Sequence, residues 1–336
     1  MLENPKIVVI GGGTGLSVLL RGLKQYTPNI TAIVTVADDG GGSGKLREDL
    51  GMLPPGDIRA CLLALANTEP TMEKVFQYRF DEGALKGQNF GNIFIAAMNE
   101  IYGSFELAIK EASNVLSITG KVYPMTLEDV RLHAELENGK IIHGESKIPI
   151  EAIKEKCKIK RIYMNPKISY PLAEAVEAIK DSDLIVLGPG SLYTSVVPNL
   201  LVNNIVDTIY MAKAPKVYVC NVMTQPGETD EFGVFDHVNG ILDHSREDFL
   251  DYVIANTEEM PEETLHKYIT DGSRPVRLKA KDEADLAKKK IILIKGNLVD
   301  VQKNYIRHDS IELSKILISI GNKANDLNGG NSFEAI

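Results

Sequence analysis

The chain has 336 residues, 44% hydrophobic and 25% charged, which is typical of a soluble globular protein that buries a core without disulfides. Its 46 acidic against 37 basic residues give a formal net charge of −9, so nucleic acid is an unfavourable partner. The three cysteines, Cys61, Cys157 and Cys220, lack both paired and metal-ligand spacing, which indicates neither a disulfide framework nor a zinc site. There is no long apolar run and no signal-peptide pattern, so we expect a cytoplasmic protein without a membrane span.

The first half of the chain alternates strand-like and helical patterns, which indicates an α/β fold with a mostly parallel sheet. A strand at 6–10 precedes a glycine turn and an amphipathic stretch, and a β-branched strand follows at 30–36. Residues 57–118 look mainly helical, and because this is long for one crossover we predict a helical lobe inserted beside the sheet. Residues 131–147 flank Asn138-Gly139, a pair that favours a type I′ β-hairpin.

The second half repeats the strand–turn–helix pattern at 183–187 and 216–220, and further strands are predicted at 275–278 and 291–294. A last helix at 309–318 should begin at Asp309 as N-cap, with Glu312 as its capping-box partner. Residues 321–336 have few apolar side chains and are predicted to be a disordered tail. The prediction is one three-layer α/β domain, 1–320, with a helical lobe and a β-hairpin.

A glycine motif, Gly11-Gly12-Gly13-Thr14-Gly15, follows the first predicted strand directly. Glycines let the backbone approach a phosphate, and the helix that follows offers free N–H groups at its positive end. Leu16 stands where the dinucleotide fingerprint needs a third glycine, so the motif supports a phosphate or nucleotide site rather than an NAD-dependent oxidoreductase. A tight strand-to-helix turn without a ligand is the alternative.

Two carboxylates, Asp38 and Asp39, follow the second predicted strand and open the segment DDGGGSGK. The segment resembles a Walker loop only superficially, because neither its spacing nor the residue after the lysine fits. Adjacent carboxylates at a strand end suit a ribose hydroxyl or Mg²⁺, and a solvated surface loop is the alternative. Asp57, after a Pro-Pro-Gly turn, is a further catalytic candidate or simply a helix cap.

Polar residues also follow later elements, in the motifs GQNFGN, GPGSLYTS and NVMTQPGET. Each is weak alone: the amides of GQNFGN, for example, suit either a ligand or a helix cap. Ligands of open α/β sheets bind outside the carboxyl ends of the strands, and four such ends here carry phosphate-compatible residues. The chain has no HExxH or GxSxG, and Ser191 has no identifiable His and Asp partners, so a hydrolase triad is unsupported.

The chain resembles the gluconeogenesis factor (YvcK-like) branch of the phospholactate transferase (CofD-like) superfamily over residues 6–317, through GGGTG, VADDGGGSGKLRE, LPPGDIRACLLALA, GQNFGN, LGPGSLYTSVVPNLLV and YVCNVMTQPGET. The resemblance implies a Rossmann-like fold, a homodimer and a nucleotide held across the strand ends. It implies a regulator that binds a UDP-sugar, acts through a protein partner, and is required for cell shape and cell-wall synthesis during gluconeogenic growth. The alternative is a transferase that uses Mg²⁺ to move a phospholactyl group from a guanine-nucleotide-activated donor to a deazaflavin precursor.

The resemblance also assigns residues. Tyr268 and Arg307 match positions that the regulator branch uses to hold its UDP-sugar, where an arginine fork suits a diphosphate and a tyrosine ring suits a base or sugar. Gln88 stands where the branch usually has a histidine, which weighs against proton transfer there because an amide does not titrate. The sequence also departs from the branch at Gly42, where the branch usually has Ser, and at Ala60, where it usually has Asn. The catalytic candidates are Asp38, Asp39 and Asp57, none of them decisive, and the metal candidates are Asp38 and Asp39. The expected ligand-binding residues are Gly12, Gly13, Thr14, Gly15, Asp38, Asp39, Ser43, Asn89, Asn92, Gly190, Ser191, Asn221, Thr224, Gln225, Tyr268 and Arg307.

The start of the last predicted helix suggests how binding could be signalled. A diphosphate held by Arg307 would order the helix start, because helix N-termini attract anions, and a phosphate on Ser310 would compete for the same arginine. A rigid helix capped by Asp309 is the alternative.

Overall fold

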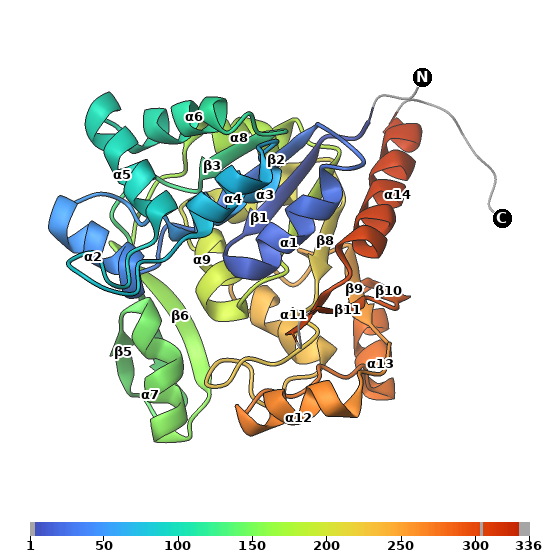
Figure 1. Ribbon diagram of the computed structural model, residues 1–336. Helices are drawn as coiled ribbons and strands as arrows, with labels where there is room; N and C mark the ends of the chain where they lie inside the picture. The colour runs from blue at the N-terminus through green and yellow to red at the C-terminus, as the bar shows by residue number, and fades with distance from the viewer. Residues whose placement is uncertain (1–3, 303–304, 329–336) are drawn as a thin grey trace.

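The computed structural model describes residues 4–302 and 305–328 and is built on a seven-stranded sheet (Figure 1). The strand order is β10-β9-β8-β7-β1-β2-β3, and every neighbouring pair is parallel. The central strands are continuous apolar runs, buried throughout, as expected of parallel strands covered on both faces. The strands are β1 (Ile7–Gly11), β2 (Ile30–Val34), β3 (Lys121–Pro124), β7 (Leu184–Leu187), β8 (Lys216–Val219), β9 (Tyr252–Asn256) and β10 (Ile292–Gly296).

Helices cover both faces of the sheet, so the predicted three-layer, Rossmann-like fold is confirmed (Figure 1). One face carries α1 (Gly13–Leu23), which packs between α3 (Gly56–Leu65) and α14 (Ser310–Asn328). Helix α1 is amphipathic, and it buries Leu16, Leu19, Leu20 and Leu23 at the spacing of one helix face. The other face carries α8 (Ala173–Lys180), α9 (Val197–Leu200) and α10 (Ile205–Met211).

The strand order reverses between β1 and β7, which is the switch point of this sheet. From β1 the chain first adds β2 and β3 on one side, and later adds β7 to β10 on the other. In open α/β sheets, ligands bind at such a point, outside the carboxyl ends of the strands.

The segment 57–118 is helical, as predicted, and lies within the connection between β2 and its parallel neighbour β3. It is thus part of a long crossover, in which α3 and α6 contact β3. Helices α4 and α5 pack on one another and, with α2 and α6, form the lobe coloured light blue to green in Figure 1. Their bounds are α2 (Gly41–Leu50), α4 (Pro70–Gln77), α5 (Phe90–Tyr102) and α6 (Phe105–Val115).

The predicted hairpin is present, but its predicted turn type is wrong. Asn138 lacks the positive φ that a type I′ turn requires, and only Gly139 has one, at 84°. The Gly139 N–H donates to Leu136 O at 2.9 Å and the Leu136 N–H donates to Lys140 O at 2.9 Å, which is the pattern of a three-residue loop with a glycine bulge. The strands β4 (Arg131–Leu136), β5 (Ile141–His143) and β6 (Ile159–Asn165) form a separate antiparallel sheet beside α7 (Ile148–Glu155).

The C-terminal region corrects two further predictions. Residues 275–278 are not a strand: Pro275 forms only an isolated bridge to Met223, and the pairing goes no further because the Arg274 N–H donates to the Thr224 hydroxyl rather than to a backbone carbonyl. Residues 321–328, predicted to be part of a disordered tail, belong to α14, and 329–336 lie outside the described residues. An antiparallel ribbon of β11 (Val299–Gln302) and β12 (Tyr305–His308) was not predicted. The helices of this region are α11 (Val234–Leu242), α12 (Glu262–Thr270) and α13 (Ala280–Lys288).

Asp309 caps α14 as predicted, since its Oδ1 accepts the N–H groups of Ile311 at 2.9 Å and Glu312 at 3.0 Å. The second hydrogen bond of the predicted capping box, from the Asp309 N–H to the Glu312 side chain, does not form. The Asp309 N–H donates to Leu298 O instead, and the Glu312 carboxylate accepts from Lys315. None of the described helices is both long and apolar enough to cross a membrane.

Candidate functional site

The helix α1 begins at the switch point with its backbone pressed against the loop that leaves β7. Gly13 has a φ of 71°, a conformation that favours glycine. A Cβ on Gly15 would lie only 2.8 Å from the Pro189 carbonyl oxygen. The glycines therefore allow the N-terminus of α1 and the loop 188–191 to form a common backbone surface.

Asn221 fixes this surface to the loop that leaves β8. Its Nδ2 donates to Gly190 O at 2.8 Å, and its Oδ1 accepts the Gly190 N–H at 3.2 Å. Gln225 adds a hydrogen bond from its Nε2 to the Ser191 hydroxyl. Asn221 thus holds the loop 188–191 in place through both the oxygen and the nitrogen of its side-chain amide. The segments that follow β1, β7 and β8 together form one continuous floor.

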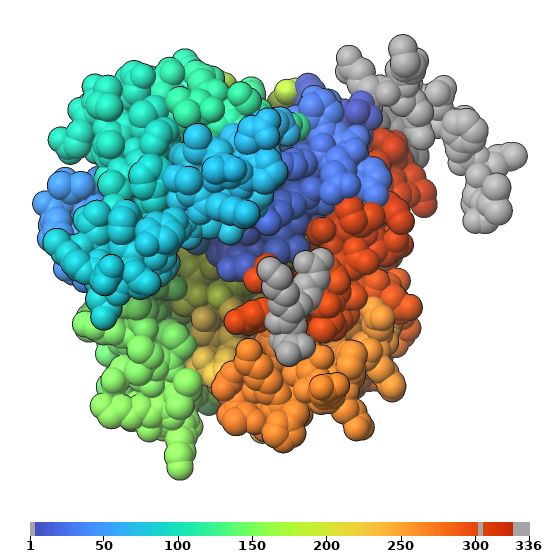
Figure 2. Space-filling view, viewed as in Figure 1, coloured from blue at the N-terminus to red at the C-terminus, as the bar shows by residue number. Residues whose placement is uncertain are grey.

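A cavity of about 470 Å³ lies over this floor. Figure 2 shows the molecule hollowed below α1, between α7 and α12. Another side of the cavity is formed by α12, through Tyr268, and by β12 of the ribbon β11–β12. Of the expected ligand-binding residues, the cavity brings together Gly13, Thr14, Gly15, Gly190, Ser191, Asn221, Thr224, Gln225, Tyr268 and Arg307.

Positive charge lies at the wall made by the ribbon. Arg307 is exposed, and its guanidinium lies 5.8 Å from the ring centroid of Tyr305. The Lys267 ammonium lies 4.7 Å from the same ring. Arg307 therefore presents a cation to a ligand in the cavity, which the positive end of α1 also lines, while Lys267 lies against the Tyr305 ring outside the lining.

Two other wall residues support the structure. His308 is buried, its Nε2 lies 3.1 Å from Cys220 O, and burial lowers its pKa to about 4, so it is neutral. Thr224 pairs with Arg274 through the backbone N–H of each, at 2.7 and 2.9 Å. These contacts fix β12 and the segment 273–275 to the strand ends.

Three partly buried acids, Asp38, Asp57 and Glu145, lie on the far side of Gly12 and form what we call the acidic cluster. A Cβ on Gly12 would lie 2.5 Å from Asp57 Oδ2, so the cluster adjoins the start of α1. Burial, with help from Asp38, raises the pKa of Asp57 to about 6, although the Gly13 N–H opposes this. Burial and the neighbouring Asp38 and Asp39 raise the pKa of Glu145 to about 8.

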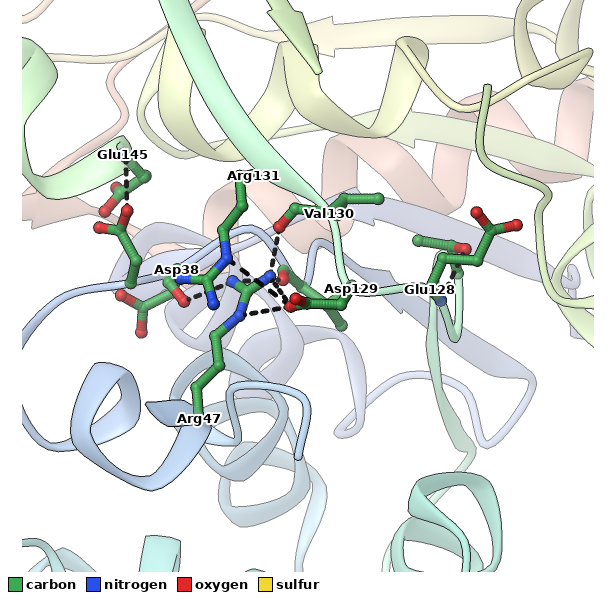
Figure 3. Close-up of polar contacts among 10 residues, drawn as sticks. Asp38, Arg47, Glu128, Asp129, Val130, Arg131 and Glu145 are labelled. Atoms are coloured by element: carbon green, nitrogen blue, oxygen red, sulfur yellow. Dashed lines mark hydrogen bonds and ion pairs between the residues drawn. The ribbon is translucent and has the colours of Figure 1, made fainter. Parts of the chain in front are cut away.

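Asp39 and Arg47 position this cluster, and Figure 3 shows Arg47 between Asp38 and Asp129. Asp39 accepts the N–H groups of Glu145 at 3.0 Å and Ser146 at 2.9 Å, and so fixes the short 3₁₀ turn η1 (Glu145–Lys147). The buried Arg47 donates to Asp38 O at 3.1 Å, to Asp129 Oδ1 at 2.8 Å and to Val130 O. Arg47 therefore ties the loop after β2 to the segment that precedes β4.

Asp38 and Asp39 have few carboxylate oxygens left to coordinate a magnesium ion. Both Asp39 oxygens already accept backbone N–H groups, and Asp38 Oδ1 accepts the Gly40 N–H at 2.8 Å. Within residues 4–302 and 305–328 no group of three or more His, Cys, Asp or Glu side chains is arranged to hold a metal ion. A magnesium ion here stays a prediction, and it would take most of its oxygen ligands from phosphates and water.

Ser43, Asn89 and Asn92 lie beside the acidic cluster rather than in the cavity. Asn89 caps α5, because its Oδ1 accepts the Asn92 N–H at 3.2 Å. Asn92 Nδ2 donates to the Ser43 hydroxyl at 3.4 Å, and that hydroxyl in turn contacts Asp38. The sequence-predicted residues thus divide into a cavity group and an acidic-cluster group on either side of Gly12.

Two further acids were missed by the sequence reasoning. Glu228 accepts the Tyr193 N–H at 3.3 Å and the Thr194 hydroxyl at 3.2 Å, and burial raises its pKa to about 7. The motif TQPGET contains it, so position in a strand-end loop was the available signal. Glu145 lies just after the hairpin and had no comparable signal, since only tertiary structure brings it to Asp38.

Comparisons with known proteins agree with this architecture. The family profile described as 2-phospho-L-lactate transferase CofD matches residues 7–299. A relative from Thermoanaerobacterium thermosulfurigenes, provisionally described as a gluconeogenesis factor, is 57% identical over 95% of this chain and 98% of its own. The protein described as gluconeogenesis factor from Bacillus subtilis is 46% identical over 95% of this chain and 99% of its own.

A crystal structure of a UPF0052 family member from Bacillus halodurans superposes with a TM-score of 0.88 at 45% identity, covering 93% of this chain and 98% of that chain. These similarities extend across the sheet, the lobe and the cavity. The chain therefore belongs to the gluconeogenesis factor family, within the CofD-like group of proteins.

Proposed function

We propose that the chain is a cytoplasmic regulator that binds a UDP-sugar in the cavity at the β1/β7 switch point. The observation that carries this proposal is the pairing of a glycine-lined helix N-terminus with the exposed Arg307 across one cavity. A diphosphate is the ligand group that both sides favour, because backbone N–H groups and a guanidinium both donate to phosphate oxygens. The nucleoside then lies along the wall that contains Tyr268.

The cellular role follows from family membership and is part of the same proposal. Relatives up to 57% identical are described as gluconeogenesis factors. We infer that the ligand-bound protein, as a homodimer, acts on a protein partner to maintain cell shape and cell-wall synthesis during growth on gluconeogenic carbon sources.

Titration calorimetry of the purified protein with UDP-glucose, UDP, UMP and GDP tests the binding step. We expect UDP-glucose and UDP to bind, UMP to bind at least tenfold more weakly because it lacks one phosphate, and GDP to bind more weakly than UDP. Arg307→Ala should weaken UDP binding by about 1.5–3 kcal/mol, the usual value of a charged hydrogen bond. Arg131→Ala, a partly exposed arginine outside the cavity, is the matched control. Failure of the wild-type protein to bind any UDP compound would overturn the proposal.

A phospholactate-type transferase is the second candidate, and the acidic cluster favours it. Asp57 is a partly buried carboxyl beside the start of α1, with its pKa raised to about 6, a value suited to a general base. The match to the CofD profile points the same way. Incubation with Mg²⁺, a guanine-nucleotide-activated phospholactate and a deazaflavin acceptor should then give a phospholactyl product by mass spectrometry. That product should disappear in Asp57→Asn.

A further inference from the structure

Three polar atoms beside the acidic cluster are buried without a hydrogen-bond partner within the described chain: Asn92 Oδ1, Gln88 Oε1 and Arg59 Nε. Buried polar groups are nearly always paired, so each such atom needs an explanation. Asn92 is only 3% exposed, which makes an unpartnered oxygen there especially costly.

Two of these side chains, Asn92 and Gln88, reach the start of α2 from different segments. Asn92 reaches Ser43 through its Nδ2, at 3.4 Å. Gln88 Oε1 lies 2.9 Å from the place where a Cβ on Gly42 would be. Arg59, from α3, packs against Gly91, the neighbour of Asn92. The unpartnered oxygens of Asn92 and Gln88 therefore lie beside the first turn of α2, while Arg59 lies next to Asn92 through Gly91.

The first turn of α2 supplies further donors. Its N-cap is Gly40, which has no side chain with which to cap the helix, and Gly41, Gly42 and Ser43 follow. The N–H groups of a first turn have no partner within the helix. The acidic cluster supplies acceptors next to them, since Asp38 contacts the Ser43 hydroxyl and Glu145 lies close to Asp38.

The hydrogen-bond donors and acceptors beside the start of α2 together determine which class of ligand fits there. Three carboxyls disfavour an anion, although a bare helix N-terminus alone would attract one. The described chain offers no three-residue metal-ligand set, and the donors of α2 and Arg59 disfavour a cation. A hydroxyl group both donates and accepts, so a polyhydroxyl compound satisfies both kinds of partner.

We propose that the start of α2, with Asp38, Ser43, Gln88, Asn92 and Glu145, forms a subsite for the hexose ring of the nucleotide sugar. This inference rests on the proposed function. The subsite adjoins the phosphate-binding end of α1, because Asp57 of the acidic cluster packs against Gly12. A diphosphate at Gly13–Gly15 therefore has the nucleoside cavity on one side and the hexose subsite on the other.

The test compares the affinities for UDP-glucose and UDP in wild-type protein and in Gln88→Ala and Ser43→Ala. We expect each variant to bind UDP-glucose about tenfold more weakly and UDP unchanged, because only the hexose contacts are lost. Gln77→Ala, an exposed glutamine on α4, is the matched control and should leave both affinities unchanged. Thermal unfolding confirms that each variant is folded, and the use of two variants keeps the test valid if one is not.

The outcomes separate the two proposals. In one outcome, the wild-type protein binds both compounds while the ratio of the UDP-glucose affinity to the UDP affinity stays the same in both variants. That result would overturn the hexose subsite and leave the proposed function standing. Arg307→Ala should weaken both compounds equally, which distinguishes the phosphate contacts from the hexose contacts. Absence of binding to the wild-type protein would overturn the proposed function and the subsite with it.

Discussion

The Tyr268 hydroxyl accepts a hydrogen bond from the Ile306 N–H at 2.9 Å. This bond joins α12 to β12, the strand that carries Arg307. The two residues that family resemblance assigns to the ligand are therefore coupled through the backbone, and Tyr268 acts on Arg307 by fixing the strand next to it.

Coupling of this kind predicts non-additive effects on binding. Tyr268→Phe should weaken UDP binding about fivefold, because loss of one hydrogen bond, about 1 kcal/mol, loosens β12. Arg307→Ala should cost about 1.5–3 kcal/mol, and the double variant should lose no more than Arg307→Ala alone. Calorimetry on the wild type, the two single variants and the double variant measures the coupling.

Strict additivity of the two losses would show that Tyr268 contacts the ligand independently of Arg307. Tyr170→Phe is the control, because Tyr170 is exposed and lies outside the cavity.

The close approach of α1 to the loop after β7 predicts that Gly15→Ala abolishes nucleotide binding. The new Cβ would lie 2.8 Å from Pro189 O, so α1 and the loop must move apart. Gly11→Ala is the matched control, because the nearest atom to its Cβ would be 3.7 Å away, an ordinary contact. Both variants should be compared by calorimetry with UDP after their folding is checked by circular dichroism. Equal affinities in both would contradict the role given to this backbone contact.

The buried Arg47 predicts a large loss of stability in Arg47→Ala. The variant leaves the carbonyl groups of Asp38 and Val130 without their donor, and loss of such a buried network costs about 3–5 kcal/mol. Arg131→Ala should cost less than about 1 kcal/mol, since that arginine is partly exposed and 3.7 Å from Asp129. Urea unfolding measures both values, and a similar loss in the two variants would argue against the network.

The buried Glu228 predicts a stability that falls as the pH rises. Its pKa is about 7 in the folded protein against 4.5 in the unfolded chain, so the folded state favours the protonated acid. The stabilisation is complete below the unfolded pKa and is lost as the pH rises through about 7. Glu145 and Asp57 shift in the same direction, so they add to the fall.

Glu228→Gln isolates the contribution of that residue. The free energy of unfolding of the variant should fall between pH 5 and pH 8 by about 3 kcal/mol less than that of the wild type. The exposed Glu100→Gln should leave the slope unchanged. An unchanged slope in Glu228→Gln would show that Glu228 is ionised across this range.

Local sequence patterns predicted the central strands and their glycine loops well. The runs at β1 and β7 are apolar and end in glycine, and both were predicted to within a residue or two. The ribbon β11–β12 was missed although Val299–Gln302 alternates apolar and polar residues, because each of its strands is only four residues long. At 275–278 the apolar residues indicated a strand, but the pairing stops after one bridge because the Arg274 N–H donates to the Thr224 hydroxyl.

The candidate site was predicted in its parts but not in its arrangement. Residues from β1, β7 and β8 meet in the cavity because parallel strands end at the same edge. Asn89, by contrast, was a candidate for base recognition, and its oxygen accepts a backbone N–H at the start of α5. The pairing of Glu145 with Asp38 joins positions more than a hundred residues apart, and no local pattern encodes that contact.

The ribbon β11–β12 rests on a small apolar cluster of its own, made of Val222, Met223 and Ile306, and separate from the main core of the described chain. Segments with few buried apolar contacts open at a lower free energy than the whole domain unfolds. We therefore expect this wall of the cavity to open at a lower free energy than the seven-stranded sheet unfolds, with breakage of the Ile306–Tyr268 and His308–Cys220 contacts. Entry and release of a ligand then require only this local opening, and a bound ligand that joins Arg307 to α1 would slow amide hydrogen exchange at residues 305–308.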